Sequence, residues 1–206
     1  MLSFDHVVVT VADYDIAAAT ILDDHGLASV AGGRHAGHGT ANRIVPLCDS
    51  YLELVAVVDG DEATHSAFGA WTASQAEAGD TLAAVCLRTD DIRRVADRLD
   101  VGTLEMSRRT PDGVELSWAV AGLDEALNDG FPFFVEWHVP ASDRPGRAAA
   151  AHVTHPEGIS WVELAGDVEH VRWWLGSHNL DIRYTDGAPG LRRVGIATRD
   201  GELILA

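Results

Sequence analysis

The sequence predicts an α+β protein built from repeated βαβββ modules. Short segments of β-branched and aromatic residues recur along the chain, as is typical of strands, and helical segments opened by aspartate follow the first strand of each group. This order of elements returns with a period of roughly 75–80 residues, which is too long for a solenoid and favours paired modules. The chain has 206 residues, of which 47% are hydrophobic, and this is enough for a sizeable core.

The first module is expected over residues 1–60. Asp13 and Asp15 place negative charge at the positive end of a helix over residues 16–24, and Gly26 marks the end of this helix. Alternating β-branched residues predict the strands of the module. They are expected at residues 4–11, 27–31, 41–47 and 51–58.

A linking segment at residues 61–80 carries the next helix, which is expected over residues 63–78 and is ended by Gly79. The second module, residues 81–140, repeats the order of the first, and Asp90 and Asp91 mark the start of its helix. We expect a strand at 82–87, a helix at 92–99 and strands at 104–108, 114–120 and 133–139.

A loop rich in proline, glycine and alanine, residues 141–157, leads to a third, shorter βαβββ-like module over residues 158–206. Its helix carries Val171, Trp174 and Leu175 at helical spacing, with Trp173 beside them, so this apolar stripe has to be buried against another surface. The expected elements are a strand at 159–164, a helix at 167–175 and strands at 181–185, 192–198 and 203–205.

The charge balance excludes several classes of function. The chain has 15 basic and 32 acidic residues, and a net charge of −17 repels phosphate backbones and anionic lipids, so we expect no nucleic-acid or membrane partner. Every basic residue is an arginine, in a bacterial-like composition, and the absence of lysine excludes Schiff-base and P-loop chemistry. No apolar run approaches the roughly 20 residues of a membrane span, and no signal segment is visible, which predicts a cytoplasmic protein.

Two groups of residues are candidates for contacting a ligand. The glycine-rich segment at residues 32–39 does not fit a G-x-G-x-x-G phosphate loop. It is either a flexible loop over a pocket, with His35 or Asn42 touching the ligand, or a bend between strands. Trp118, Phe134 and Trp137 lie on expected strands, where such residues line either an apolar binding wall or the core.

Several stretches carry a resemblance to a known family. The first strand reads Phe-Asp-His-Val-Val-Val at residues 4–9, and the last strand of the first module reads Tyr-Leu-Glu-Leu-Val at residues 51–55. The other matching stretches are residues 33–35, 39–43 and 132–137. Over roughly its first 165 residues, the chain resembles the glyoxalase-like domain proteins of the vicinal oxygen chelate (glyoxalase/bleomycin resistance/dioxygenase) superfamily. The resemblance implies paired modules that form a curved, cupped mixed sheet with helices on the outside.

The resemblance also implies a set of metal-site residues. Metal-dependent members place ligands on the first and last strands of each module, which correspond here to His6, Glu53 and Glu136. The fourth position falls at Leu82 or an alanine beside it, neither of which binds a metal, and His138 is a candidate substitute. The expected cofactor is therefore none or a weakly bound divalent metal ion. Without a metal, the two glutamates act as a general acid and base or only hydrogen-bond within the sheet.

From this resemblance we expect His6, Glu53 and Glu136 to converge in one cavity as the catalytic residues. The implied function is a small-molecule enzyme of the lyase or isomerase class that acts on an oxygen-rich or hydrophobic metabolite. A metal held by these residues would act as a Lewis acid on adjacent substrate oxygens. The alternative is a metal-free protein that binds or sequesters a hydrophobic small molecule in the same cup.

The third module has no counterpart in a paired arrangement. Because modules of this kind close a cup in pairs, a third module leaves one face and one edge of a sheet uncovered. The strand at 192–198 has no obvious partner module within the chain, so we expect a homodimer through the third module. The alternative is that this module packs on the first two and caps the cup.

Overall fold

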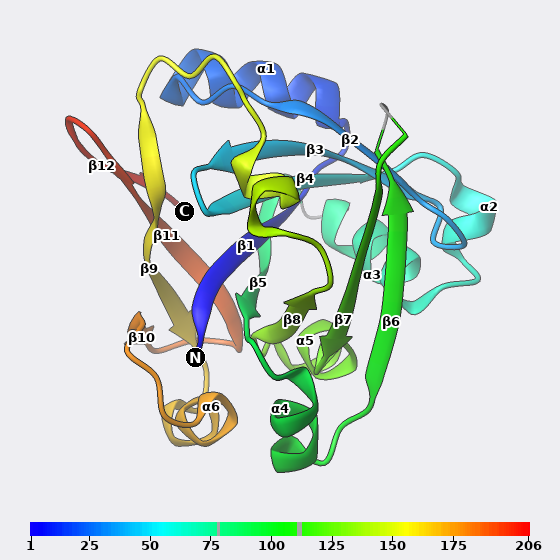
Figure 1. The fold of residues 1–206 in the computed structure, drawn as a ribbon, viewed down its shortest axis with the longest axis vertical. Helices are drawn as coiled ribbons and strands as arrows, with labels where there is room; N and C mark the ends of the chain where they lie inside the picture. The colour runs from blue at the N-terminus through cyan, green and yellow to red at the C-terminus, as the bar shows by residue number, and fades with distance from the viewer. Residues whose placement is uncertain (78, 111–112) are drawn as a thin grey trace.

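The computed structural model describes residues 1–77, 79–110 and 113–206. It confirms the α+β class, with a mixed sheet that curves into a cup and helices on its outside (Figure 1). The large sheet has eight strands, and a separate sheet of four strands is formed by the last part of the chain. The expected end of the linking helix at Ala78 lies outside the described residues.

The first half of the large sheet contains one helix between its first two strands. This helix begins after Asp13, whose carboxylate accepts hydrogen bonds from the amides of Asp15 and Ile16. It ends at Gly26, whose φ of 66° lies in the left-handed region that glycine adopts readily. The elements are β1 (Ser3–Thr10), α1 (Tyr14–His25), β2 (Val30–His35), β3 (Thr40–Leu47) and β4 (Ser50–Val57).

The second half follows two linking helices, α2 (Gly60–Ala63) and α3 (Ala67–Ala76). It contains a helix that the sequence did not predict, α5 (Leu123–Asp129), which lies between two glycines with left-handed backbone, Gly122 and Gly130. The other elements are β5 (Thr81–Arg88), α4 (Ile92–Leu99), β6 (Thr103–Arg109), β7 (Glu115–Ala121) and β8 (Phe133–Trp137).

The two halves have the same strand order and meet at their first strands. The order across the sheet is β2-β3-β4-β1-β5-β8-β7-β6, with β1 antiparallel to β5. In each half the first strand pairs in parallel with the last, β1 with β4 and β5 with β8. The halves are therefore related by an approximate two-fold rotation about an axis between β1 and β5.

The β1–β5 pairing contains two bulges that obey this rotation. Between Phe4 and His6 the register shifts by one residue, which leaves Asp5 as the extra residue of β1. A second shift between Val8 and Val9 leaves Ala83 as the extra residue of β5. Asp5 in the first half therefore corresponds to Ala83 in the second half.

The two edges of the large sheet approach each other and nearly close the cup. Strands β2 and β6 are in contact, and Arg108 Nη1 on β6 donates a hydrogen bond to the backbone oxygen of Gly32 on β2 at 3.0 Å. Arg108 therefore joins the two halves at the side opposite the β1–β5 pair.

The last part of the chain repeats the expected order of elements but not the topology of a module. Its strands are arranged β10-β9-β11-β12, so the first strand pairs with the second and third rather than with the last. The third βαβββ-like module is therefore a different four-stranded sheet. Its elements, after two short 3₁₀ turns at Ala141–Asp143 and Pro145–Arg147, are β9 (Pro156–Ala165), α6 (Val168–Leu175), β10 (Asp181–Thr185), β11 (Gly190–Thr198) and β12 (Gly201–Leu205).

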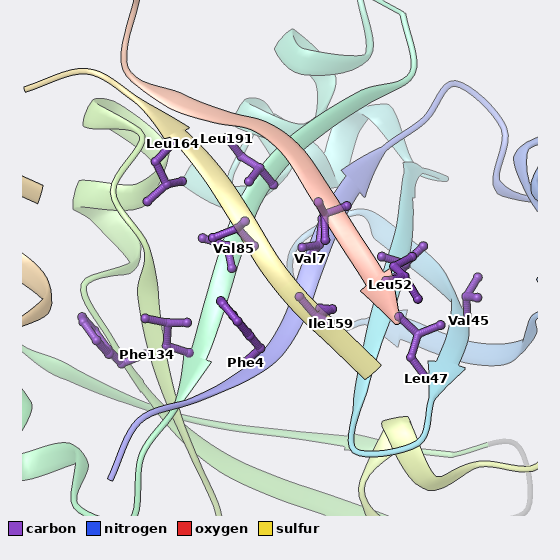
Figure 2. Close-up of a cluster of buried hydrophobic side chains, with 14 of the residues drawn as sticks. Phe4, Val7, Val45, Leu47, Leu52, Val85, Phe134, Ile159, Leu164 and Leu191 are labelled. Atoms are coloured by element: carbon purple, nitrogen blue, oxygen red, sulfur yellow. The ribbon is translucent and has the colours of Figure 1, made fainter. Parts of the chain in front are cut away.

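The small sheet covers the outer face of the large one. Figure 2 shows Ile159 of β9 and Leu191 of β11 facing the side chains of Val7 and Val85, which belong to the central pair of strands. In Figure 1 the small sheet lies to the left of β1 and β5. The larger hydrophobic cluster of the protein therefore lies between the two sheets, and a smaller one lies on the inner face of the cup.

This packing removes the premise of the expected dimer. Strand β11 pairs with β9 and β12 and contacts β5, so the idea that it lacks an intramolecular partner is wrong. In the apolar stripe of α6, Trp174 is buried within the chain, whereas Trp173 is 56% exposed. Dimerisation through this segment stays a prediction that light scattering at low micromolar protein will test.

The helices fall into two groups. Helices α1 and α4 pack on the outer face through Ala17, Ala18, Ile92 and Val95. Helices α3 and α5 contact each other, and α3 contributes Phe68 to the apolar cluster on the inner face of the sheet. In the described part of the chain, no helix is long and apolar enough to cross a membrane.

The contact between the two sheets predicts a large loss of stability when it is weakened. Ile196 on β11 is fully buried, so I196A is expected to lower the free energy of unfolding by about 2–5 kcal/mol. The matched control is I204A on β12, where the side chain is 51% exposed, and its expected change is within about 0.5 kcal/mol. Urea unfolding measures both, and equal losses would contradict the burial of β11.

Candidate functional site

A cavity opens on the inner face of the large sheet, and the space between its lining atoms, including the mouth, is about 710 Å³. Polar side chains come mainly from the first half of the sheet and apolar ones mainly from the second. The polar lining residues are His6, His35, His38, Asn42, Tyr51, Glu53 and Arg108. The apolar ones are Val8, Ile44, Phe68, Met106, Trp118, Val120, Leu123, Phe133, Val135 and Trp137.

His6 is held in one orientation by Asp5. The Asp5 carboxylate lies 2.8 Å from His6 Nδ1, and because a carboxylate only accepts hydrogen bonds, Nδ1 carries the proton. Asp5 is buried and also accepts from Arg88 Nη1 at 3.3 Å and from Trp137 Nε1 at 2.9 Å. The other imidazole nitrogen, Nε2, is therefore left to face the cavity.

Asp5 is a site residue that the sequence analysis missed. Neighbouring residues of a regular strand point to opposite faces, which would place Asp5 behind the sheet and away from His6. The bulge at Asp5 breaks this alternation and brings both side chains together. Arg88 holds the Asp5 carboxylate in place, and Arg88 is itself fixed because its Nη2 donates to the Asp49 carboxylate at 2.6 Å.

Glu53 lies opposite His6 and is surrounded by two imidazoles and one amide. Its Oε2 is 3.6 Å from His6 Nε2, and its Oε1 accepts from Asn42 Nδ2 at 2.5 Å and lies 3.4 Å from His35 Nε2. Burial alone raises the pKa of Glu53, but the hydrogen bond to His35, the charge of His6 and the Asn42 amide together lower it from 4.5 to about 2. Glu53 is therefore a permanent negative charge beside His6.

The glycine-rich segment is half strand and half turn, since residues 32–35 lie on β2 and residues 36–39 form the turn to β3. Gly32 and Gly33 lie on β2, and the amide of Gly33 donates to Asn42 Oδ1 at 2.8 Å. A Cβ on Gly32 would lie 1.8 Å from Asn42 Oδ1, so only glycine allows this close approach. Through these contacts β2 fixes the amide that holds Glu53.

His38 and Tyr51 are further lining residues that sequence reasoning missed. His38 lies in the turn between β2 and β3, and its Nδ1 lies 2.5 Å from Ser66 Oγ at the start of α3. The Tyr51 ring stacks on His6 with 4.6 Å between ring centroids. Burial, followed by the charges of Asp5 and Glu53, raises the pKa of Tyr51 well above its ordinary value, so its hydroxyl remains a donor. Alternation from Glu53 along β4 was the available signal for Tyr51.

The expected convergence of Glu136 with His6 and Glu53 is wrong. On β8, Phe133 pairs with Cys86, and the residues facing the cavity are Phe133, Val135 and Trp137. Glu136 therefore points to the other face, where its carboxylate accepts from the amide of Ile92 at 2.7 Å. There the carboxylate accepts a hydrogen bond from a backbone amide in the first turn of α4, which has no partner within the helix.

Two other expected residues also lie outside the cavity. Phe134 has the same strand phase as Glu136 and is fully buried in the outer core, so it is not a substrate contact. His138 follows β8, and its Nδ1 lies 3.5 Å from Glu105 Oε2 with the imidazole 39% exposed. It cannot complete a metal site with His6.

The aromatic wall is made by Trp118 and Trp137, whose ring centroids are 5.2 Å apart. Both line the cavity, on the neighbouring strands β7 and β8. Trp137 also reaches the polar half through its bond to Asp5, so the wall adjoins the imidazole of His6. Contact with a substrate stays a prediction for both residues.

The residues present do not fit a four-ligand metal ring. The two-fold rotation carries His6 to Ala84, because His6 pairs with Cys86 and Val8 pairs with Ala84. It carries Glu53, which pairs with Val8, to Phe133, which pairs with Cys86. The first-strand position of the second half, where no metal ligand was expected, is therefore Ala84. The last-strand position of that half is Phe133, which is also apolar.

A second group of possible ligands is formed by Asp5, His6 and Cys86, which each place one donor atom within 4.8 Å of the others. Burial raises the pKa of the Cys86 thiol well above its ordinary value, so the sulfur stays protonated and is a poor ligand. The Asp5 oxygens already accept from Arg88, Trp137 and His6. These hydrogen bonds are enough to explain why the side chains of Asp5 and His6 lie close together.

The sequence profile of the glyoxalase-like domain matches residues 4–204. The chain belongs to the glyoxalase-like domain family. The expected resemblance is therefore confirmed, and it covers the small sheet as well as the two halves of the cup. A comparison with curated protein sequences found no match to this glyoxalase-like domain protein.

Several solved structures are similar to this chain, and the first below shares its fold over the whole length. A hypothetical protein from Staphylococcus aureus is 18% identical with a TM-score of 0.73, and the match covers 100% of this chain and 99% of that one. A Streptomyces coelicolor methylmalonyl-CoA epimerase in complex with 2-nitronate-propionyl-CoA is 18% identical, covering 66% of this chain and 97% of its own, with a TM-score of 0.49. The Mycobacterium tuberculosis methylmalonyl-CoA epimerase is 19% identical, covering 65% and 85%, with a TM-score of 0.46.

The donor set of this glyoxalase-like domain protein predicts weak metal binding at best. With Ala84 and Phe133 at two ring positions, only His6 and Glu53 remain, and losing ligands leaves an exchangeable ion. Elemental analysis after extensive dialysis against a chelator is expected to find no stoichiometric metal. Zinc or nickel retained at one ion per chain would show that this interpretation of the site is wrong.

The low pKa of Glu53 predicts a pH-dependent contribution to stability. Because folding lowers this pKa from 4.5 to about 2, the charge stabilises the folded state above pH 4.5, and the stabilisation is lost as the pH falls towards 2. A shift of this size corresponds to about 3 kcal/mol. E53Q is expected to be less stable than the wild type by about that amount at neutral pH, and urea unfolding should show the difference shrinking in acid.

The matched control for this measurement is E157Q, since Glu157 is exposed. Its difference from the wild type is expected to be small and independent of pH. A constant difference for E53Q over the same pH range would contradict a low pKa at Glu53.

Proposed function

We propose that this protein is a metal-independent enzyme of the isomerase or lyase class that removes a proton from a carbon next to a carbonyl group. The observation that carries the proposal is the Asp5–His6–Glu53 arrangement, in which one imidazole nitrogen is fixed by a carboxylate and the other faces the cavity beside a second carboxylate. Membership of the glyoxalase-like domain family supports a small-molecule substrate in the cup.

His6 is the general base in this proposal. The Asp5 carboxylate holds the proton of His6 on Nδ1, which leaves Nε2 to accept a proton, whereas Glu53, with a pKa of about 2, is too weak a base. His6 Nε2 takes the proton, the electron pair of the C–H bond forms the carbon–carbon double bond of an enolate, and the carbonyl oxygen gains the negative charge. Glu53 and Asp5 then stabilise the imidazolium from its two nitrogens.

Tyr51 supplies the donor for the enolate oxygen. Its hydroxyl stays protonated, and its ring stacks on the imidazole that removes the proton. A neutral donor placed where charge develops stabilises the transition state more than the ground state. Return of the proton from His6 to the substrate gives isomerisation, and loss of a leaving group from the enolate gives a lyase reaction.

The second candidate is a protein that binds a hydrophobic small molecule without reaction. The observation in its favour is the apolar character of the second half of the cavity, where Ala84 and Phe133 replace the counterparts of His6 and Glu53. Both candidates expect binding in the cavity, and they differ only in proton transfer.

Solvent exchange at carbon tests the enzymatic proposal. With small carbonyl compounds in D₂O, NMR is expected to show incorporation of deuterium next to the carbonyl group, and H6N is expected to lower its rate about 100-fold or more. The control is H65N, since His65 lies on the surface, and its rate should equal that of the wild type. Saturable binding of these compounds without exchange favours the binding protein, and an unchanged rate in H6N excludes His6 as the base.

A further inference from the structure

Arg108 is the one arginine among the described residues that line the cavity. It lies on β6 and is partly buried, and its Nη1 is anchored to the backbone oxygen of Gly32 at 3.0 Å. This hydrogen bond fixes the guanidinium at the seam of the cup. The remaining nitrogens have no hydrogen bond to any described residue.

Among the residues that the structure describes, no carboxylate matches the charge of Arg108. The chain has 32 acidic residues, yet none of those that the structure describes lies within ion-pair distance of this guanidinium. Glu53, the carboxylate of the cavity, is already occupied by Asn42 at 2.5 Å, His35 at 3.4 Å and His6 at 3.6 Å. A partly buried cation that has a backbone oxygen but no counter-charge among the described residues is costly unless a ligand supplies the opposite charge.

The surroundings of Arg108 indicate which anion fits. Arg108 lines the same cavity as Tyr51, whose ring stacks on His6, and its positive charge opposes part of the rise in the pKa of the Tyr51 hydroxyl. The rest of the second half of the cavity is apolar, including Val120 and Val135. An anionic head beside Arg108 would therefore continue into an apolar body against this wall.

We infer that Arg108 binds a carboxylate of the substrate, and that the substrate class is a small hydrophobic carboxylic acid. A planar guanidinium with free nitrogens pairs with a carboxylate through two parallel hydrogen bonds. This inference rests on the proposed function only in taking the same cavity as the substrate site. It concerns the binding of the substrate, so it can be tested without catalytic turnover. In that reaction Arg108 fixes one end of the molecule while His6 acts on a carbon next to its carbonyl group.

Matched acids and amides test this assignment by binding alone. The probes are benzoate, phenylacetate and hexanoate, each compared with its own primary amide, and the readouts are calorimetry and the fluorescence of the cavity tryptophans. The wild type is expected to bind at least one acid about 10- to 100-fold more tightly than its amide. In R108Q the affinity for the acid should fall to that for the amide, while the affinity for the amide stays unchanged.

Two further variants keep the test independent of folding defects. R109Q removes the neighbouring arginine, which is 73% exposed and lies 4.0 Å from Glu115, and it should keep the full preference for the acid. R108K keeps a cation without the planar fork, so its preference should lie between those of the wild type and R108Q. Retention of the full preference in R108Q, equal binding of acids and amides by the wild type, or no binding of any probe at millimolar concentration would each overturn the inference.

The outcome is separable from that of the proposed function. A preference for acids that depends on Arg108, together with no deuterium exchange, would retain the carboxylate site and remove the enzymatic proposal. Exchange that depends on His6, together with equal binding of acids and amides, would retain the enzyme and remove the role of Arg108.

Discussion

The antiparallel pairing of β1 with β5 joins the two halves of the large sheet, and its hydrogen bonds decide which side chains face the cup. A bulge in this pair turns Asp5 to the same side as His6, and Arg88 on β5 then holds the Asp5 carboxylate. The other face of the same two strands receives the small sheet. One strand pair thus supports both the hydrophobic core and the polar site.

The two halves of the cup share a topology but have diverged in chemistry. The first half carries an Asp–His pair at its bulge, and the second half carries Ala83 and Ala84 there. The counterpart of Glu53 is Phe133. A cavity with one polar and one apolar side suits a molecule that is itself divided in this way, which agrees with a carboxylic acid bound at Arg108.

Sequence reasoning succeeded where alternation was clear and failed where it was not. The family resemblance indicated His6 on β1 and Glu53 on β4, and the alternation along each strand agreed with an inward position for both. On β8 the sequence Phe-Phe-Val-Glu-Trp is apolar on both faces, because one face meets the cavity and the other meets the core. The sequence of β8 therefore does not show whether Glu136 or its neighbour Val135 faces the cavity.

By itself, the sequence determined the kinds and order of the elements, apart from α5 and the division of the linking helix into α2 and α3, because strand alternation and helix caps such as Asp13 and Gly26 act between residues close along the chain. Only the tertiary structure decided that Asp5 joins His6, that Glu136 turns away and that β11 covers the outer face. Each of these depends on the register of strands far apart in sequence. A one-residue shift of such a register reverses the face of every following side chain without changing the local pattern.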